Sequence, residues 1–257
     1  MPPFELTILG SGSSAGTPVV GCNCNTCLSV NPKNKRTRCS SLIKLKSGEH
    51  ILIDTSPDLR FQSLRESILR VDAVLYTHTH ADHLHGIDDL RAFCQLHKMQ
   101  IPIYGKKESL DHIALKFGYA LNEPKGFWEM PVLKAMPIQD PFQLFGELVT
   151  PIPVAHGKSE IYGYRIGNLA YLTDVSDIPE SSLKLLDGLD ILLLDCLRTK
   201  EHHTHINLEQ SLIFANRIKA KKTYLIHMTH DLEYEALKKE LPGHIDVGYD
   251  GLKIIIN

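Results

Sequence analysis

The sequence contains no apolar run that approaches the length of a membrane span, and its first residues lack the basic and apolar regions of a signal peptide. It also lacks an excess of positive charge, because 28 lysines and arginines stand against 30 acidic residues, for a formal net charge of −2. These absences argue against a membrane protein, an exported protein and a protein coated in positive charge for nucleic acid. We therefore expect a cytoplasmic protein that makes no membrane contact and does not take nucleic acid as its partner.

Cysteine is scarce, with six residues in a chain of 257. In a reducing compartment we interpret these cysteines as metal ligands or buried thiols rather than as disulfides. Low-complexity segments, internal repeats and linker-like runs are also missing, so nothing in the sequence divides the chain. Hydrophobic residues make up 43% of it, which is enough to bury a substantial core, and we predict a single domain over residues 1–257.

Short β-rich runs alternate with helical patterns along most of the chain. This alternation predicts a layered α/β fold, and the β-rich runs near 40–55 and 148–174 favour mixed rather than purely parallel sheets. Asn207 and Gln210 form a capping-box pattern at the start of one predicted helix. Between 122 and 147 the pattern weakens and prolines accumulate, which predicts either a mobile lid or the seam between two halves of the fold. The predicted strands are 4–10, 40–46, 50–55, 73–78, 101–105, 148–155, 161–166, 169–174, 190–196, 222–228 and 245–256, and the predicted helices are 58–69, 83–98, 107–121, 179–188, 207–220 and 232–241.

Four metal-binding side chains lie within one short segment of the chain: His78, His80, Asp82 and His83. They follow the apolar run 73–77, which we predict to be a short buried strand, so the ligands lie in the loop at its carboxyl end. Imidazole and carboxylate together suit zinc, manganese or iron, and this spacing can face two metal ions. The density of ligands predicts a metal centre rather than a solvated polar loop.

Further candidate ligands follow other predicted strands. His156, Asp174 and His227 each come directly after an apolar run. Any one of them alone would be interpreted as a turn residue or as a polar group with its hydrogen bonds satisfied. Sheet-based sites, however, collect ligands from the carboxyl ends of several strands, so these residues and the first segment together predict one shared centre.

The order of these residues, with Asp54 before them, resembles the five-motif pattern of the metallo-β-lactamase superfamily. The resemblance covers almost the whole chain. It implies an αβ/βα sandwich with two mixed sheets face to face, helices outside, and two divalent metals (manganese or zinc, or iron) in a cleft along one sheet edge. Asp174 would bridge the two metals, and Asp54 would orient a metal-binding histidine. The resemblance implies one metal on His78, His80 and His156, and the other on Asp82, His83 and His227.

A second cluster consists of Cys22, Cys24 and Cys27, in the loop after the first predicted strand. Free exposed thiols at this density would be readily oxidised, so a structural zinc is the favoured interpretation. Such a site needs four ligands, and Cys39 is one candidate for the fourth. His230 is the better candidate, because three cysteines in the pattern Cys-x-Cys-x-x-Cys plus a histidine at this position resemble the phosphoribosyl cyclic phosphodiesterases of the PhnP type. A zinc here would fix the N-terminal loop beside the active site.

This narrower resemblance implies an enzyme: a dinuclear metal-dependent phosphodiesterase of phosphonate metabolism. Its substrate would be a small phosphorylated sugar that carries a cyclic phosphate, and the resemblance allows a homodimer. His205 would protonate the departing sugar oxygen, although His202 and His203 beside it are alternatives for this role. Asp82 would act both as a metal ligand and as a proton acceptor. Lys158 would bind a second phosphate that does not react, or would be an exposed lysine with no role.

Other functions fit part of the pattern. A tRNA 3′-end endonuclease shares the metal-binding motifs but carries a long basic, glycine-rich arm that this sequence lacks. Coenzyme PQQ biosynthesis protein B shares the cysteine loop, but its relatives depart from the histidine motif kept here. A thioesterase of the glyoxalase II type fits the metal ligands alone. A zinc-stabilised binding module is the non-catalytic alternative, and the complete ligand set argues against it. Substrate identity is not determined by these motifs, because superfamily members with the same ligands act on different esters.

Two further features have competing interpretations. Gly10, Gly12 and Gly16 resemble a dinucleotide-binding loop superficially, but the spacing differs and no helix follows. A close backbone approach near the metals, or a plain tight turn, explains these glycines better. The basic run at 33–38 would either contact phosphate or lie in a solvated loop.

Overall fold

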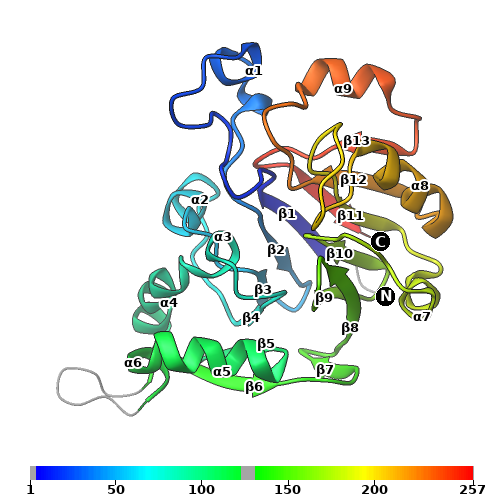
Figure 1. Cartoon of the computed structure of the whole chain (residues 1–257). Helices are drawn as coiled ribbons and strands as arrows, with labels where there is room; N and C mark the ends of the chain where they lie inside the picture. The colour runs from blue at the N-terminus through cyan, green and yellow to red at the C-terminus, as the bar shows by residue number, and fades with distance from the viewer. Residues whose placement is uncertain (1–3, 123–130, 257) are drawn as a thin grey trace.

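The computed structural model describes residues 4–122 and 131–256. Two seven-stranded sheets pack face to face, with helices on their outer sides (Figure 1). The first sheet has the order β14 (Lys253–Ile256), β1 (Phe4–Gly10), β2 (Ser40–Lys44), β3 (His50–Ile53), β4 (Ala73–Leu75), β5 (Ile101–Gly105) and β6 (Leu133–Pro137). The second sheet has the order β13 (Ile245–Val247), β12 (Lys222–Ile226), β11 (Ile191–Asp195), β10 (Leu169–Leu172), β9 (Ser159–Ile166), β8 (Glu147–His156) and β7 (Phe142–Leu144).

Both sheets are mixed, as the sequence predicted. In the first sheet, the strands from β14 to β3 pair antiparallel and those from β3 to β6 pair parallel. In the second sheet, β10 to β13 are parallel and β7 to β10 are antiparallel. Parallel strands place their carboxyl ends at the same edge of a sheet, so the loops that follow β3, β4, β10, β11 and β12 can supply one shared site.

The core has three layers because the sheets are covered on both faces. In β11, Ile191 and Leu193 belong to the central cluster between the sheets, while Leu192 and Leu194 belong to the cluster under the outer helices. Side chains alternate between the faces of a strand, so a continuous apolar run is buried on both sides. A third cluster packs the helices that follow β3, β4 and β5 against the first sheet. This arrangement is the αβ/βα sandwich that the sequence predicted.

The helices cover the outer faces, and no helix within 4–122 and 131–256 has the length and apolarity needed to cross a membrane. The helix that covers β11 begins at the predicted capping box, where Asn207 Oδ1 accepts the Gln210 N–H and Gln210 Oε1 accepts the Asn207 N–H, both at 2.9 Å. The α-helices are α1 (Asn25–Leu28), α2 (Leu59–Arg65), α3 (Ala81–Leu84), α4 (Leu90–His97), α5 (Lys107–Lys116), α6 (Gly118–Leu121), α7 (Glu180–Leu183), α8 (Leu208–Ile218) and α9 (Tyr234–Glu240), and the 3-10 helices are Pro32–Asn34, Ile87–Asp89 and Lys184–Leu186.

Several predicted elements are divided in the structure, among them the helix expected at 107–121, which forms α5 and α6, and two whose division has a clear cause. The helix expected at 83–98 is broken at Gly86, where a Cβ atom would lie 1.9 Å from the Ser56 carbonyl oxygen. This close packing bends the chain between α3 and α4. The strand expected at 245–256 is two strands in different sheets, β13 and β14, separated by a turn in which Gly251 has a φ of +85°.

The weak region at 122–147 lies where the chain passes from one sheet to the other. Residues 123–130 lie outside the described residues. The remainder contains β6 and β7, which are edge strands of the first and second sheet. This placement agrees with the prediction of a seam. The two short strands were not predicted because the prolines of this region argue against a strand. Proline is tolerated at a sheet edge, however, and Pro137 ends the edge strand β6.

Candidate metal centre

The predicted ligands lie in loops at the carboxyl ends of strands in both sheets. His78 and His80 lie in the loop after β4, and Asp82 and His83 lie on the short helix α3. From the second sheet, His156 is the last residue of β8, Asp174 follows β10, and His227 follows β12.

These side chains form two groups that share Asp174, and the ligand atoms within each group lie within 4.8 Å of one another. Asp174 Oδ2 lies 3.7 Å from His78 Nε2 and 4.0 Å from His156 Nε2. Its Oδ1 lies 3.0 Å from His83 Nε2 and 3.3 Å from His227 Nε2. The carboxylate thus presents one oxygen to each group, which is the geometry of a residue that bridges two metals. The first group is His78, His80, His156 and Asp174, and the second group is Asp82, His83, Asp174 and His227.

Asp54 contacts the His83 ring at the nitrogen that does not face Asp174. Its Oδ2 lies 2.8 Å from His83 Nδ1, so Nε2 of the same ring is directed at the shared carboxylate. The Thr77 backbone N–H and hydroxyl donate to the two Asp54 oxygens, each at 2.8 Å. The carboxylate is fully buried, and burial raises its pKa, while the hydrogen bonds from His83 and Thr77 oppose that rise. A histidine held in this way has its tautomer and its direction fixed before any metal binds.

Three residues of the site have left-handed backbone conformations. Asp54, Asp174 and His227 have φ values of 60°, 57° and 59°. A positive φ is uncommon for residues other than glycine and carries a conformational cost that surrounding contacts must offset. Each of these residues lies within two residues of the end of a strand, β3, β10 or β12, so the left-handed conformation falls where the chain leaves the sheet.

The carboxylates of the centre favour positive charge. Burial lowers the pKa of His227, but Asp174, Asp82 and Asp195 outweigh this effect and raise it to about 9. The pKa of His83 is likewise raised well above its ordinary value, with Asp174 as the main partner that overcomes burial. Burial opposes ionisation of Asp174, yet the surrounding histidines hold its pKa well below the usual range.

This donor set fits divalent metals. Imidazole nitrogens and carboxylate oxygens are the ligands that zinc, manganese and iron share. His78 Nε2 is buried and has no hydrogen-bond partner within the described part of the chain, and such a nitrogen is costly unless something coordinates it. Cations bound by these residues would supply the positive charge that the carboxylates favour, without protons on the ligand nitrogens.

His205 lies at the edge of the same centre, and Asp195 holds it there. His205 Nε2 is 3.7 Å from Asp174 Oδ2, and its Nδ1 is 3.0 Å from Asp195 Oδ2. The other Asp195 oxygen lies 3.6 Å from His227 Nδ1. The buried Asp195 carboxylate therefore contacts both rings on the side away from the cleft. Sequence reasoning missed this residue, although it ends an apolar strand in the same way as Asp174.

The two neighbouring histidines lie farther out. The His202 ring is 5.4 Å from the His205 ring, and its Nδ1 lies 3.0 Å from the Thr204 hydroxyl. His203 is exposed. Of the three candidates for an active-site histidine, the structure therefore places His205 closest to the shared carboxylate. The same loop supports the first group, because the Thr204 carbonyl oxygen lies 2.9 Å from His156 Nδ1.

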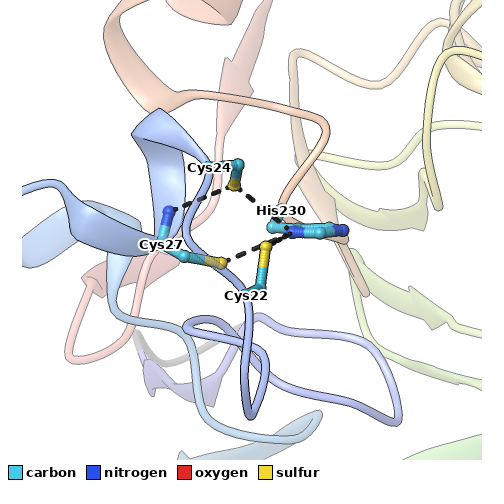
Figure 2. A group of neighbouring side chains, drawn as sticks. All are labelled: Cys22, Cys24, Cys27 and His230. Carbon is cyan, nitrogen blue, oxygen red and sulfur yellow. Dashed lines mark hydrogen bonds between the residues drawn. The ribbon is translucent and has the colours of Figure 1, made fainter.

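The cysteine cluster forms beside this centre. Figure 2 shows the three sulfur atoms around the ring of His230, whose Nδ1 lies 3.2 Å from Cys22 Sγ and 3.4 Å from both Cys24 Sγ and Cys27 Sγ. Tetrahedral zinc with ordinary Zn–S and Zn–N bonds requires a sulfur–nitrogen separation of about 3.5 Å. The spacing therefore fits zinc, and Cys39, which is buried in the core between the sheets, lies apart from this group.

The thiols of this cluster differ in their readiness to ionise. The Cys27 backbone N–H donates to Cys24 Sγ and lowers the pKa of Cys24 to about 6, against a smaller opposing effect of burial. Burial raises the pKa of Cys27 to about 11. The thiolate is the form that binds a metal, so Cys24 offers that form near neutral pH while Cys27 requires the cation itself to ionise it.

The basic run at 33–38 is largely part of the structure that holds the cysteine loop. Arg36 is 2% exposed and donates to the carbonyl oxygens of Thr229, at 2.9 Å, and Leu232, at 2.6 Å, on either side of His230. Lys33 lies over the Tyr234 ring, with its ammonium 4.5 Å from the ring centre. These contacts favour neither of the two predicted roles, because Arg36 is neither solvated nor free to bind phosphate.

The glycine loop makes the close backbone approach that the sequence favoured. The Ser13 N–H donates to the Met228 carbonyl oxygen at 3.1 Å, and the Met228 N–H donates to the Ser11 carbonyl oxygen at 3.0 Å. A Cβ atom at Gly10 would lie 1.9 Å from the Arg38 carbonyl oxygen. The loop is thereby joined to the segment between His227 and His230.

A cavity of about 340 Å³ opens beside the first ligand group. We call it the cleft cavity. His78, His80 and His156 form one side of it. Lys158 is exposed in the turn between β8 and β9 and does not line this cavity.

The fold and the paired ligand groups define an αβ/βα sandwich with a metal-binding cleft. Residues 49–228 match the family described as the beta-lactamase superfamily domain, so the chain belongs to that superfamily. It is also similar to the crystal structure of a new diphosphatase from the PhnP family, with 41% identity and a TM-score of 0.92 over 99% of this chain and 97% of the other. The predicted resemblance to PhnP-like members of the superfamily is confirmed.

Two other relatives match 97% of this chain. An octanoyltransferase from Porphyromonas gingivalis is 40% identical over 97% of this chain, but the chain spans only about half, 51%, of that protein. The zinc-bound PqqB from Methylobacterium extorquens shares the fold, with a TM-score of 0.80 at 20% identity over 97% of this chain and 99% of the other.

Proposed function

We propose that this chain is a dinuclear metal-dependent phosphodiesterase that hydrolyses a small cyclic phosphodiester of a phosphorylated sugar. The observation that carries the proposal is the shared carboxylate: Asp174 presents one oxygen to each ligand group, and His205 approaches the same residue at 3.7 Å. Similarity to a PhnP-family diphosphatase supports hydrolysis at phosphorus in particular.

The residues of the first group would hold one divalent metal and those of the second group the other, with manganese, zinc and iron all suited to the donors. The chemistry that such a pair supplies is a lowered pKa for bound water and neutralisation of charge on the phosphoryl oxygens. A separate zinc on Cys22, Cys24, Cys27 and His230 would have a structural role only, because all four of its positions are taken by protein ligands.

His205 is the proposed general acid. Asp195 accepts a hydrogen bond from Nδ1 and so leaves Nε2 as the nitrogen that faces the cleft. When water attacks phosphorus and the bond to the sugar oxygen breaks, a proton on His205 Nε2 passes to that oxygen, which leaves as a hydroxyl group. Asp82 lies 3.5 Å from His227 Nε2 and would accept the proton that the attacking water gives up.

The name of the Porphyromonas relative raises acyl transfer as a rival activity. The matching region is half of that protein, so the similarity does not by itself assign the transferase activity to this region. Two metal-ligand groups around one carboxylate favour hydrolysis of a phosphate ester over acyl transfer, because paired metals neutralise the charge that gathers on phosphoryl oxygens.

The test is turnover of 5-phosphoribosyl 1,2-cyclic phosphate by manganese-loaded protein, followed by phosphorus NMR, with Asp174→Ala as the blank. We expect ring opening by the wild type alone. An octanoyl thioester is assayed in parallel. Absence of phosphodiester turnover together with efficient release or transfer of the octanoyl group would overturn the proposal.

A further inference from the structure

The cleft cavity is the place where a substrate bound at the metals would extend. One side is the first ligand group, and the others come from two separate segments: the junction of β5 and α5, and the β8–β9 hairpin. Its volume of about 340 Å³ lies at the small end of the range for small-molecule sites. The cavity therefore suits one compact group joined to the reacting phosphate.

The remaining walls are mostly polar. Lys106, Glu108 and Ser109 come from the β5–α5 junction, and Ser159, Glu160 and Ile161 come from the hairpin. Hydroxyl groups and the two carboxylates can exchange hydrogen bonds with a sugar, while the lysine is the one cation among these lining residues that is available to an anionic group. Lys106 also immediately precedes α5, a helix of ten residues whose amino end is positive.

Lys106 forms an ion pair with Glu160 that an anionic ligand can replace. Its Nζ lies 3.0 Å from Glu160 Oε1, and the lysine side chain is 29% exposed while that of Glu160 is 58% exposed. An exposed carboxylate is a weak partner, because water competes for both charges. A phosphate dianion carries more charge and more acceptor atoms than Glu160, so it can take that place on the ammonium.

We propose that the cleft cavity binds the phosphate monoester of the substrate that is not hydrolysed, and that Lys106 is the residue that selects for it. Glu160 occupies the ammonium when no ligand is bound and is displaced by the phosphate. The proposal rests on the proposed function, since the diester must lie at the metals for its sugar to enter this cavity. It assigns to Lys106 the role expected of Lys158, which is exposed in the hairpin turn outside the cavity.

The experiment compares two substrates, 5-phosphoribosyl 1,2-cyclic phosphate and the same cyclic ester without the 5-phosphate. The measured quantity is the ratio of kcat/KM for the phosphorylated over the unphosphorylated ester. Lys106→Gln removes a charge-assisted hydrogen bond and is expected to lower this ratio by about 10- to 100-fold. Glu160→Gln removes the competing carboxylate and is expected to raise the ratio by about 2- to 5-fold.

Lys107→Gln is the matched control, because Lys107 is 70% exposed, pairs with Asp111 and does not line the cavity. Its ratio should equal that of the wild type. The proposal is wrong if Lys106→Gln leaves the ratio unchanged, or if Lys158→Gln lowers it instead.

A binding measurement separates this proposal from the proposed function. Metal-loaded protein is titrated with ribose 5-phosphate by calorimetry. Binding to the wild type that is lost in Lys106→Gln supports the subsite, even if neither cyclic ester is hydrolysed. Equal binding to both proteins, or no binding to the wild type, overturns it.

Discussion

The two ligand clusters lie on neighbouring segments but are built in different ways. The cleft centre takes its ligands from the carboxyl ends of strands in both sheets, and His83, Asp174 and His227 are at most 2% exposed, although His80 is exposed. The cysteine cluster takes three ligands from one loop and a single histidine from another. Cys22 and Cys24 are partly exposed there.

The support behind the ligands differs as well. In the cleft centre, Asp54 and the Thr204 carbonyl oxygen contact the outer nitrogens of the ligands His83 and His156, so these rings are directed before a metal arrives. Around the cysteines, Val20 and Val30 are each 99% exposed, and little apolar packing supports the loop. The fold therefore arranges the first centre, whereas a zinc bound in the second would arrange the exposed part of the loop.

The sharpest test of this contrast is Asp174→Ala. Loss of the carboxylate shared by both groups is expected to abolish activity and to empty the cleft of both metals, because the first group then has no negative ligand and the second keeps only Asp82. The cysteine cluster should keep its zinc, since it shares no ligand with the cleft. Metal analysis per chain and turnover check both parts. A variant that retains two cleft metals and turns over substrate would contradict the bridging role.

His205→Ala tests the acid rather than the metals. Both cleft metals should remain, because His205 is not a member of either ligand group. Turnover is expected to fall by roughly two decades or more, the usual contribution of a positioned general acid. His203→Ala is the control, since it removes an exposed histidine from the same loop. Full turnover of the first variant with both metals bound would exclude the acid role.

The clustering of the cleft side chains was predictable because its signals are local. Each ligand comes at the end of an apolar run, and parallel strands bring such ends together. Asp195 was not predicted because its partner, His205, comes near it only when the loop at 196–206 returns to the cleft. The pattern of an acidic residue ending the run 191–194 was nevertheless visible in the sequence.

The fold was predicted less evenly. Strands with a clear apolar pattern, such as β8 and β11, were placed correctly, whereas the edge strands β6 and β7 were missed because they contain few apolar residues. The break at Gly86 depends on contact with Ser56, which local sequence does not encode. Lys106 was overlooked for a similar reason: its neighbour Glu160 is 54 residues away along the chain.

Asp195→Asn examines the support of the dinuclear centre. The neutral amide weakens the contact with His205 Nδ1, and turnover is expected to fall by about 10- to 100-fold, because the proposed general acid loses the charged group that orients it. In a His205→Ala background the same substitution should lower turnover much less, because Asp195 acts on turnover through the His205 ring. Equal effects in both backgrounds would show that Asp195 acts through His227 instead.

Cys24→Ala should have the smallest effect on turnover and the largest on the cysteine loop. One zinc per chain is expected to be lost while both cleft metals stay, because the backbone pairing of Met228 with Ser11 and Ser13 still positions the loop after His227. The midpoint of thermal unfolding should fall by several degrees, since 1 kcal/mol corresponds to about 2–4 °C at this chain length. Hydrogen exchange should rise at residues 17–36 and stay unchanged in β4 and β12.

Cys94→Ala, which removes a buried thiol from α4, is the control that keeps its zinc. If Cys24→Ala instead empties the cleft, the two centres are coupled through the segment between His227 and His230, and the contrast between a centre arranged by the fold and one arranged by its metal no longer holds.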